Sequence, residues 1–182
     1  MKTKNKIFLL FIFCCSLTKI FCQEKNALKQ HLKAEFSLIN LSLDYDLPLS
    51  EKFLLNLSAG VGGANLFSNN RAEYRLGNGY SGQFAKVQAR YYLNREKRAE
   101  KGKSLVGNAG SFVAFQSKFN WNGGKEYIGE ALLNDITFGQ ILPLGKRITF
   151  KYYVGAGYGY NLKYNQGMVY PAISLSFGFV IL

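Results

Sequence analysis

The sequence predicts an all-β fold, an eight-stranded antiparallel β-barrel preceded by a short export signal. The chain holds 12 Tyr, 15 Phe and 19 Gly but only 3 Pro, a composition that favours strands and tight turns. From about residue 26 onward, apolar and polar residues alternate with the period of two that a two-faced strand requires. The length of 182 residues fits a single domain.

The first 22 residues are interpreted as a signal peptide, and residues 23–182 as the barrel domain. Lysines at positions 2, 4 and 6 precede an apolar run over residues 7–15, which is the order of a secretory signal. That run is shorter than the roughly 20 residues of a membrane-spanning helix. A lipoprotein acylated at Cys22 is an alternative, although the small residue expected before the cysteine is missing. All three cysteines lie in this segment, so no disulfide framework is expected in the mature chain.

The first four predicted strands are defined by what their two faces carry. Residues 27–34 set Leu and Ala against Lys and His, and residues 37–47 set Ile, Leu and Tyr against Asn, Ser and Asp. Residues 53–62 set Phe, Leu and Val against Asn, Ser and Gly, whereas residues 83–93 set Ala, Val and Tyr against Lys, Gln and Arg. The run 27–34 has the weakest pattern of the eight.

Four further strands follow in the second half of the chain. Residues 111–121 set Val, Phe and Trp against Gln, Lys and Asn, and residues 131–142 form a weaker run. Residues 147–160 alternate Ile, Phe, Tyr and Val with Thr, Lys and Gly, and residues 170–182 alternate Ile, Leu and Phe with Ser and Gly. The resulting even number of strands places both termini on the same side of a barrel.

The predicted connections alternate between short and long. Residues 48–52 and 143–146 form short turns, whereas residues 63–81, 122–130 and 161–168 are expected to form longer loops. Short turns belong on the periplasmic side of a bacterial membrane barrel. The charged segment 94–108 is the exception, because parity places it with the short turns.

The chemistry of the two faces favours a membrane barrel over a soluble one. A soluble, lipocalin-like ligand-binding barrel also alternates, but its apolar face points inward. Here the polar face mixes small residues with charges of both signs, which suits the packed, ion-paired lumen of eight strands better than an aqueous pore. Most runs reach the roughly 9 to 11 residues that a tilted membrane strand needs. Aromatic residues near strand ends match interfacial girdles: Tyr45, Tyr91, Trp121, Tyr158 and Tyr160.

Three short motifs carry a family resemblance: Asn-Leu-Ser-Leu-Asp-Tyr-Asp at 40–46, Arg-Tyr-Tyr-Leu-Asn at 90–94 and Ser-Phe-Gly-Phe at 176–179. With the signal peptide, they make the mature chain resemble the small outer-membrane β-barrel family of OmpA/OmpX-like proteins. The resemblance implies an eight-stranded barrel with periplasmic termini in the outer membrane of a Gram-negative envelope, inserted by the barrel-assembly machinery. Outer-membrane lipid is then the expected partner, and the net charge of +12 is attributed to export and to lumenal charges, with no nucleic acid bound.

The expected function is structural, in envelope integrity or surface interaction through the longer loops, without catalysis. Asp44 and Asp46 share one strand face and are able to hold a cation, but pairing with lumenal Lys or Arg is the favoured interpretation. His31 is the one histidine, so a lipid-modifying outer-membrane hydrolase, which is the alternative function, would have to use it. No catalytic, cofactor-binding or metal-binding residue is predicted.

Other motifs have plain structural explanations. The glycines at 155, 157 and 159 lack the last glycine and the helix of a nucleotide loop, and they are interpreted as small lumenal residues. The sequons at 40–42 and 56–58 lie in predicted strands, where glycosylation is not expected. The basic residues between 95 and 103 are interpreted as a solvated turn, with anionic head groups or a periplasmic partner as the alternative.

Overall fold

The computed structural model describes residues 27–68, 71–75, 81–121 and 130–182, with side chains for all of these except 64–68, 71–75 and 81. The predicted signal peptide and most of the predicted 122–130 loop lie outside the described residues.

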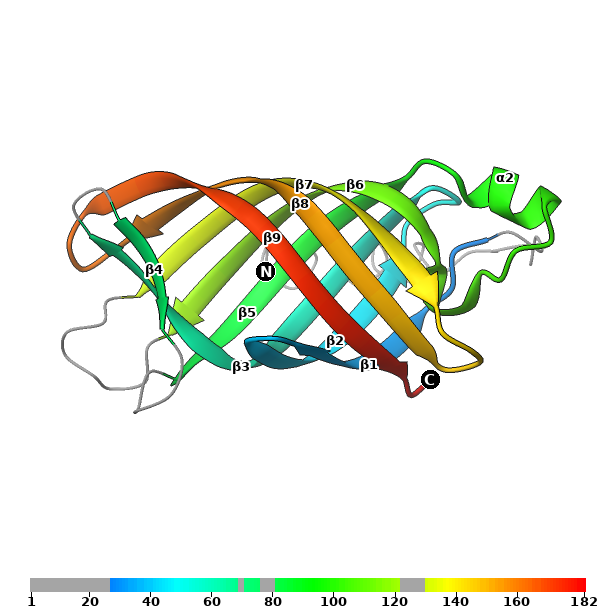
Figure 1. Ribbon diagram of the computed structural model, residues 1–182, viewed down its shortest axis with the longest axis horizontal. Coiled ribbons are helices and arrows are strands. Elements are labelled where there is room, and N and C mark those ends of the chain that lie inside the picture. Colours follow the sequence, from blue (N-terminus) through cyan, green and yellow to red (C-terminus); the bar gives the residue numbers. More distant parts are fainter. Residues whose placement is uncertain (1–26, 69–70, 76–80, 122–129) are drawn as a thin grey trace, which may run out of the picture.

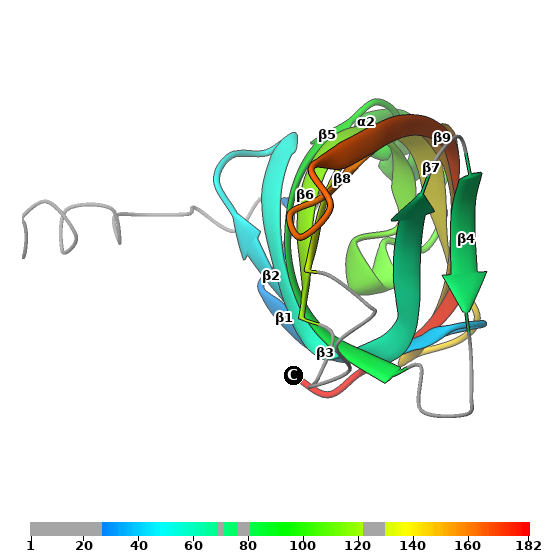
Figure 2. The same cartoon turned by 90° about the vertical axis from the view of Figure 1, so that its left-hand side faces the viewer.

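The described strands form a closed antiparallel barrel of eight strands, in which each strand pairs with the next along the ring and β9 pairs back onto β1. Figure 1 shows the strands tilted around a common axis, and Figure 2 looks down the ring. A short additional strand, β4 (Arg71–Arg75), pairs with the far end of β3 outside the ring. The ring consists of β1 (His31–Ser37), β2 (Asn40–Pro48), β3 (Phe53–Ser68), β5 (Ser81–Tyr92), β6 (Gly110–Trp121), β7 (Ala131–Pro143), β8 (Ile148–Asn161) and β9 (Gln166–Val180).

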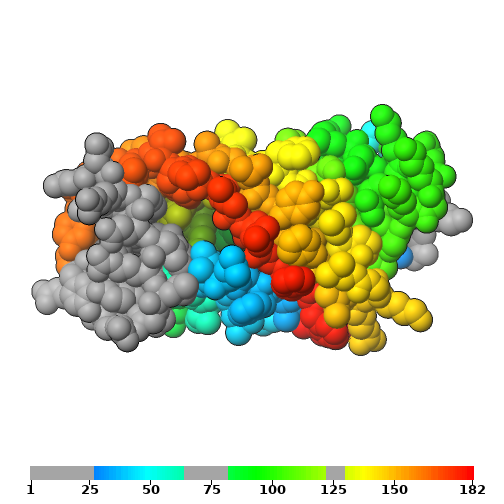
Figure 3. All heavy atoms as spheres, viewed as in Figure 1, coloured from blue at the N-terminus to red at the C-terminus, as the bar shows by residue number. Residues whose placement is uncertain are grey.

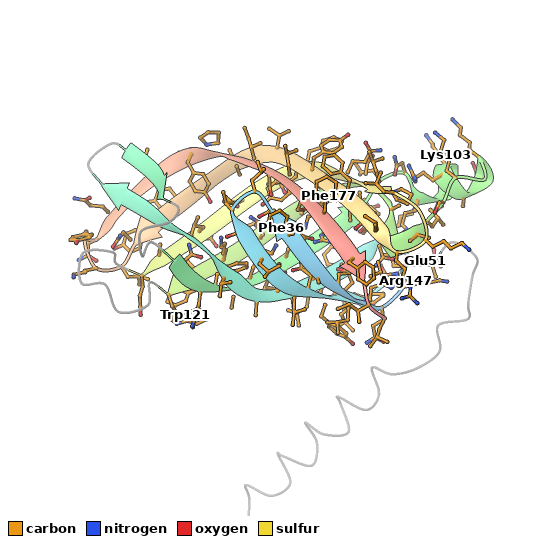
Figure 4. The ribbon with its side chains drawn as sticks, turned by 60° about the horizontal axis from the view of Figure 1, so that its bottom comes forward. Phe36, Glu51, Lys103, Trp121, Arg147 and Phe177 are labelled. Carbon is orange, nitrogen blue, oxygen red and sulfur yellow. The ribbon has the colours of Figure 1, made fainter. Side chains whose placement is uncertain are left out.

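The predicted orientation of the two faces is confirmed. Leu41, Phe115 and Phe177 point outward and are 52–55% exposed, whereas Asp44 and Arg90 are 1% exposed in the lumen. Figure 4 shows sticks projecting from the whole outer wall, Phe177 among them. The inward-facing apolar core that a soluble ligand-binding barrel requires is therefore not the arrangement of these residues.

The first predicted strand is real but shifted along the chain, and the second begins later than predicted. β1 covers His31–Ser37 rather than 27–34, and β2 begins at Asn40. The predicted run 37–47 therefore spans a chain reversal. The error arose because the turn residues Leu38 and Ile39 are apolar, like the strand residues around them, and the turn contains no Gly or Pro. The Ser37 hydroxyl holds this turn by accepting a hydrogen bond from the Asn40 amide at 3.0 Å.

Two predicted loops are largely strand. The 63–81 loop contains the end of β3, which runs to Ser68, and β4, which pairs with it. The 161–168 loop shrinks to a turn over residues 162–165, because β9 begins at Gln166 instead of residue 170. Polar and Gly-rich composition indicated loops here, but hairpins that extend beyond a barrel ring also carry polar residues.

The segment 94–108 forms a cap over one end of the barrel, which accounts for its length. It contains α2 (Arg95–Glu100) and the short 3-10 helix η1 (Val106–Asn108), and Figure 1 shows α2 beyond the strand ends. On its outer side Lys52 donates to Glu96 at 2.9 Å, and this hydrogen bond raises the pKa of Lys52.

The interpretation of this segment as a solvated turn is wrong for Arg95, which is only 4% exposed. Its guanidinium donates to the carbonyl oxygens of Ala27 at 2.9 Å and Ala109 at 3.4 Å. Arg95 therefore ties the cap to the chain that enters β1. The other basic residues of the segment are half-buried or exposed: Lys97, Arg98, Lys101 and Lys103.

Gly107 and Asn108 fasten the cap to the lumen through a left-handed backbone, with φ angles of 61° and 60°. The Gly107 carbonyl accepts a hydrogen bond from Lys33 Nζ at 3.2 Å. The Asn108 amide group donates to the Lys29 carbonyl at 2.8 Å and to Asp46 Oδ2 at 3.1 Å, and its oxygen accepts from the Lys29 amide at 2.9 Å. The cap and the N-terminal approach are thus joined at one buried side chain.

We expect Asn108→Gly to lower the free energy of unfolding by about 1–3 kcal/mol, because Lys29 and Asp46 lose a buried partner while the left-handed backbone stays accessible. Asn165→Gly is the matched control, since Asn165 also has a positive φ of 52° but lies in an exposed turn. Urea unfolding in lipid vesicles, followed by the fluorescence of Trp121, the one tryptophan, measures both. Equal effects of the two substitutions would refute the anchoring role.

Candidate functional site

Asp46 is the centre of a buried ion cluster in the lumen. It is fully buried, and its carboxylate lies 2.5 Å from Lys33 Nζ and 3.5 Å from Arg90 Nη1. The Asn56 side chain donates a hydrogen bond to Asp46 Oδ1 at 2.8 Å, and Asn108 of the cap donates to Asp46 Oδ2. Strands β1, β3 and β5 supply one partner each to Asp46 of β2, because alternation directs every second side chain inward.

A chain of hydrogen bonds continues from this cluster across the lumen. Arg90 Nε donates to Gln88 at 2.6 Å, and Gln88 donates to Gln116 at 3.0 Å. Gln116 and the Tyr170 hydroxyl both donate to Asp135. The chain therefore links five strands, β2, β5, β6, β7 and β9, through side chains alone.

Apolar layers enclose this polar middle on both sides. Near the cap, a buried cluster fills the lumen: Leu28, Leu54, Tyr92, Phe112, Ala114 and Ile141. Toward the opposite end, Ala131 and Leu133 pack against Met168 and Tyr170. Water is thereby restricted around the Asp46 cluster, which strengthens the attraction between its charges and makes any loss of a partner costly.

A second ion pair lies nearer the β1–β2 turn. Lys151 Nζ is 2.6 Å from Glu35 Oε1 and 2.7 Å from Oε2. Asp44 has a different partner, because its Oδ1 accepts from the Ser42 hydroxyl at 2.6 Å. The predicted neutralisation of lumenal cations thus holds for Asp46 through direct ion pairs. Asp44 has a hydroxyl as its nearest contact, and it attracts Lys86, Lys151 and Arg90 at longer range.

The barrel wall has an opening because the β1–β2 hairpin is short. β1 pairs with β9 no further than Ser37↔Ser176, so residues 166–175 of β9 have no ring partner on this side among the described strands. The far end of β3 and β4 approach β9 beyond the hairpin tip. Figure 3 shows a hollow between the blue β1–β2 hairpin and the red β9. We call this opening the window, bounded by residues 37–40 and by residues 166–175.

A cavity of about 40 Å³ lies in the lumen behind the window. Ser37 and Asn40 of the hairpin tip line its near side, and Lys86 of β5 and Lys118 of β6 line its far side. Glu35 completes its charged lining. The cavity is thus a polar space that connects the interior charges to the gap in the wall.

The remaining predicted site residues have structural positions. His31 begins β1, and its Nδ1 lies 3.2 Å from the Leu182 carbonyl oxygen. Gly157 faces the lumen, where an added Cβ would collide with Asp135 and Tyr170, so the interpretation of this glycine as a small lumenal residue is confirmed. The two sequons lie in β2 and β3, as predicted, and Asn56 is fully buried.

The comparisons with known proteins do not assign this chain to a family. No protein-family model matches the sequence, and no curated protein or solved structure gives a significant match. The resemblance to OmpA/OmpX-like proteins therefore stays a prediction.

None of the helices in the described part of the chain is long and apolar enough to cross a membrane. Over the same residues, no three His, Cys, Asp or Glu side chains are grouped as metal ligands.

We expect Asp46→Asn to destabilise the barrel by about 3–5 kcal/mol, because Lys33 and Arg90 would stay buried without their carboxylate. Glu51→Gln removes a negative charge from an exposed turn and is the matched control, with an expected effect within about 0.5 kcal/mol. The urea midpoint in vesicles measures both. A loss below about 1 kcal/mol for Asp46→Asn would show that the cluster is not needed for stability.

Proposed function

We propose that this protein is an integral outer-membrane β-barrel with a structural or surface-interaction role and no catalysis. The carrying observation is the polarity of the wall, because outward Leu, Ile, Val and Phe surround a lumen of paired charges. These outward side chains form an apolar belt around the barrel. In water the belt would be one large exposed apolar surface, whereas in a bilayer hydrocarbon would cover it. Ile136, Val169 and Ile173 are 66–70% exposed, well above what a soluble surface usually tolerates for clustered aliphatic residues.

The distribution of residues along the barrel axis supports the same proposal. Trp121 lies at one end of the wall and is 42% exposed. Figure 4 places Glu51, Lys103 and Arg147 at the opposite end, beyond the apolar belt. Aromatic and charged residues at the two ends of an apolar belt are typical of interfacial anchoring.

The filled lumen argues for a structural role over transport. The ion cluster, the hydrogen-bond chain and the two apolar layers occupy the interior between the cap and the opposite end. Eight strands leave room for side chains but not for an aqueous channel. The resemblance to OmpA/OmpX-like envelope proteins adds the proposed location, the outer membrane, and the proposed insertion by the barrel-assembly machinery.

One pair of substitutions separates a membrane barrel from a soluble one. Ile136 lies in the middle of β7 and points outward. In a bilayer, Ile136→Arg should therefore cost about 2–4 kcal/mol of folding free energy. Leu144→Arg, in the exposed β7–β8 turn, should cost at most about 1 kcal/mol. In a soluble barrel both arginines would meet water and both effects would stay within about 0.5 kcal/mol. Equal, small effects in vesicle-based unfolding would therefore overturn the proposal.

Fractionation tests the location directly. When the full chain is produced with its export signal in a Gram-negative host, we expect it in the detergent-extracted outer-membrane fraction. The protein should migrate differently on gels before and after heating, because a closed barrel resists detergent unfolding. Recovery from the soluble periplasmic fraction would contradict the proposal.

A further inference from the structure

Two lysines face each other across neighbouring strands of the lumen. Lys86 of β5 and Lys118 of β6 are directly opposite in the strand register, and both line the cavity behind the window. Like charges at directly opposite positions destabilise a strand pair. Lys86 is 9% exposed and makes no hydrogen bond or ion pair with any described residue. The Lys118 ammonium lies 4.3 Å from the centre of the Phe84 ring.

The carboxylates nearby are each shared with other groups. Asp44 attracts Lys86 most strongly, but it also attracts Lys151 and Arg90 and accepts a hydrogen bond from Ser42. Glu35 lines the same cavity but is held by Lys151 at 2.6 Å. Asp135 accepts hydrogen bonds from Gln116 and Tyr170. On the barrel strands with described side chains, five lumenal cations face four carboxylates, an excess of one positive charge: Lys33, Lys86, Arg90, Lys118 and Lys151 against Glu35, Asp44, Asp46 and Asp135.

We propose that the cavity behind the window binds an oxyanion group, a carboxylate or a phosphate, between the ammonium groups of Lys86 and Lys118. The cavity volume of about 40 Å³ compares with roughly 10–15 Å³ needed to hold one water on the same measure. It therefore has room for about three water-sized atoms, which is the size of a small oxyanion head. The Tyr153 hydroxyl, which also lines the cavity, adds a hydrogen-bonding group.

The window indicates how such a group reaches the lysines. Ser174 lines the cavity, while its neighbours Ile173 and Leu175 on β9 point outward and are 66% and 45% exposed. Phe36, on the β1 side of the window, is 59% exposed. An amphiphile therefore fits with its anionic head in the cavity and its apolar tail along the outer wall. A free anion shares the head chemistry and lacks only the tail.

The test measures the binding of acetate, octanoate and inorganic phosphate to the full chain folded in a zwitterionic detergent, at constant ionic strength, by calorimetric titration. Saturable binding of at least one probe, at one site per chain, is the expected result. Lys86→Met and Lys118→Met should each weaken it by about tenfold or more, the loss expected for one charge-assisted hydrogen bond. Lys146→Met removes a positive charge from an exposed turn and should change the affinity by less than about twofold.

The three probes separate the two sources of the oxyanion. Octanoate binding at least about tenfold tighter than acetate identifies an amphiphile head, whereas equal affinities or a preference for phosphate identify a free anion.

Lys118→Met should also raise the thermal unfolding midpoint without ligand, because the like-charge pair is gone, and this readout remains if Lys86→Met does not fold. Absence of saturable binding at millimolar concentrations, or binding unchanged in both lysine variants, overturns the site. The head-group site does not rest on the proposed membrane location. The Ile136→Arg experiment and these titrations therefore test two separate proposals, and either proposal can be refuted without the other.

Discussion

The barrel depends on one constraint: charges that the alternating sequence directs into a narrow closed lumen must find partners there. Lys33, Asp46 and Arg90 meet within 3.5 Å, and bulk water does not reach them. This requirement also fixes the strand register. A slip of one residue in β2 would turn Asp44 and Asp46 onto the apolar outer wall and bring Tyr45 into the ion cluster. The buried charges therefore favour one strand register over its alternatives.

The cap follows from the same constraint. The end of the lumen nearest α2 is apolar around Leu54 and Phe112, but the Asp46 cluster lies close behind it and has hydrogen-bonding capacity left over. A tight turn between β5 and β6 would have no side chain to reach that cluster. The longer segment brings in Asn108 and the Gly107 carbonyl, and Arg95 fixes the approach of the chain to β1. Its length is thus explained by the closure of the barrel end.

The sequence predicted the strands well where alternation was strict and failed where the backbone reverses without a turn signal. Strands β5 to β8 lie within two residues of their predicted limits, because alternation extends over most of each strand and polar or turn-forming residues bound it. The turn after Ser37 escaped detection because Leu38 and Ile39 are both apolar and neither Gly nor Pro marks the reversal. The cap was not predicted at all, since charged residues in a connection usually indicate solvent, and nothing local marks Arg95 as buried.

Inward orientation of individual side chains was predictable, but their partners were not. Asp46 was placed correctly on the lumenal face, yet pairing with Lys33 required the true limits of β1. The opposition of Lys86 and Lys118 depends on the register across the 94–108 segment, and a connection of that length sets no register by itself. Cross-strand partners are a property of the closed ring rather than of any single strand.

Two departures from regular barrel construction occur at the same place, and together they support the binding site. No described strand pairs with the β1-side edge of residues 166–175 of β9, and Lys86 and Lys118 lie directly opposite each other beside the cavity. A chain selected for stability alone has no need of either: a longer hairpin would pair the open edge, and a neutral residue at 118 would relieve the repulsion. Departures from local rules concentrate where function requires them. The cavity joins the window to the two lysines. In the proposed site, the window is therefore the entrance for the anion, and Lys86 and Lys118 supply the positive charge that binds it.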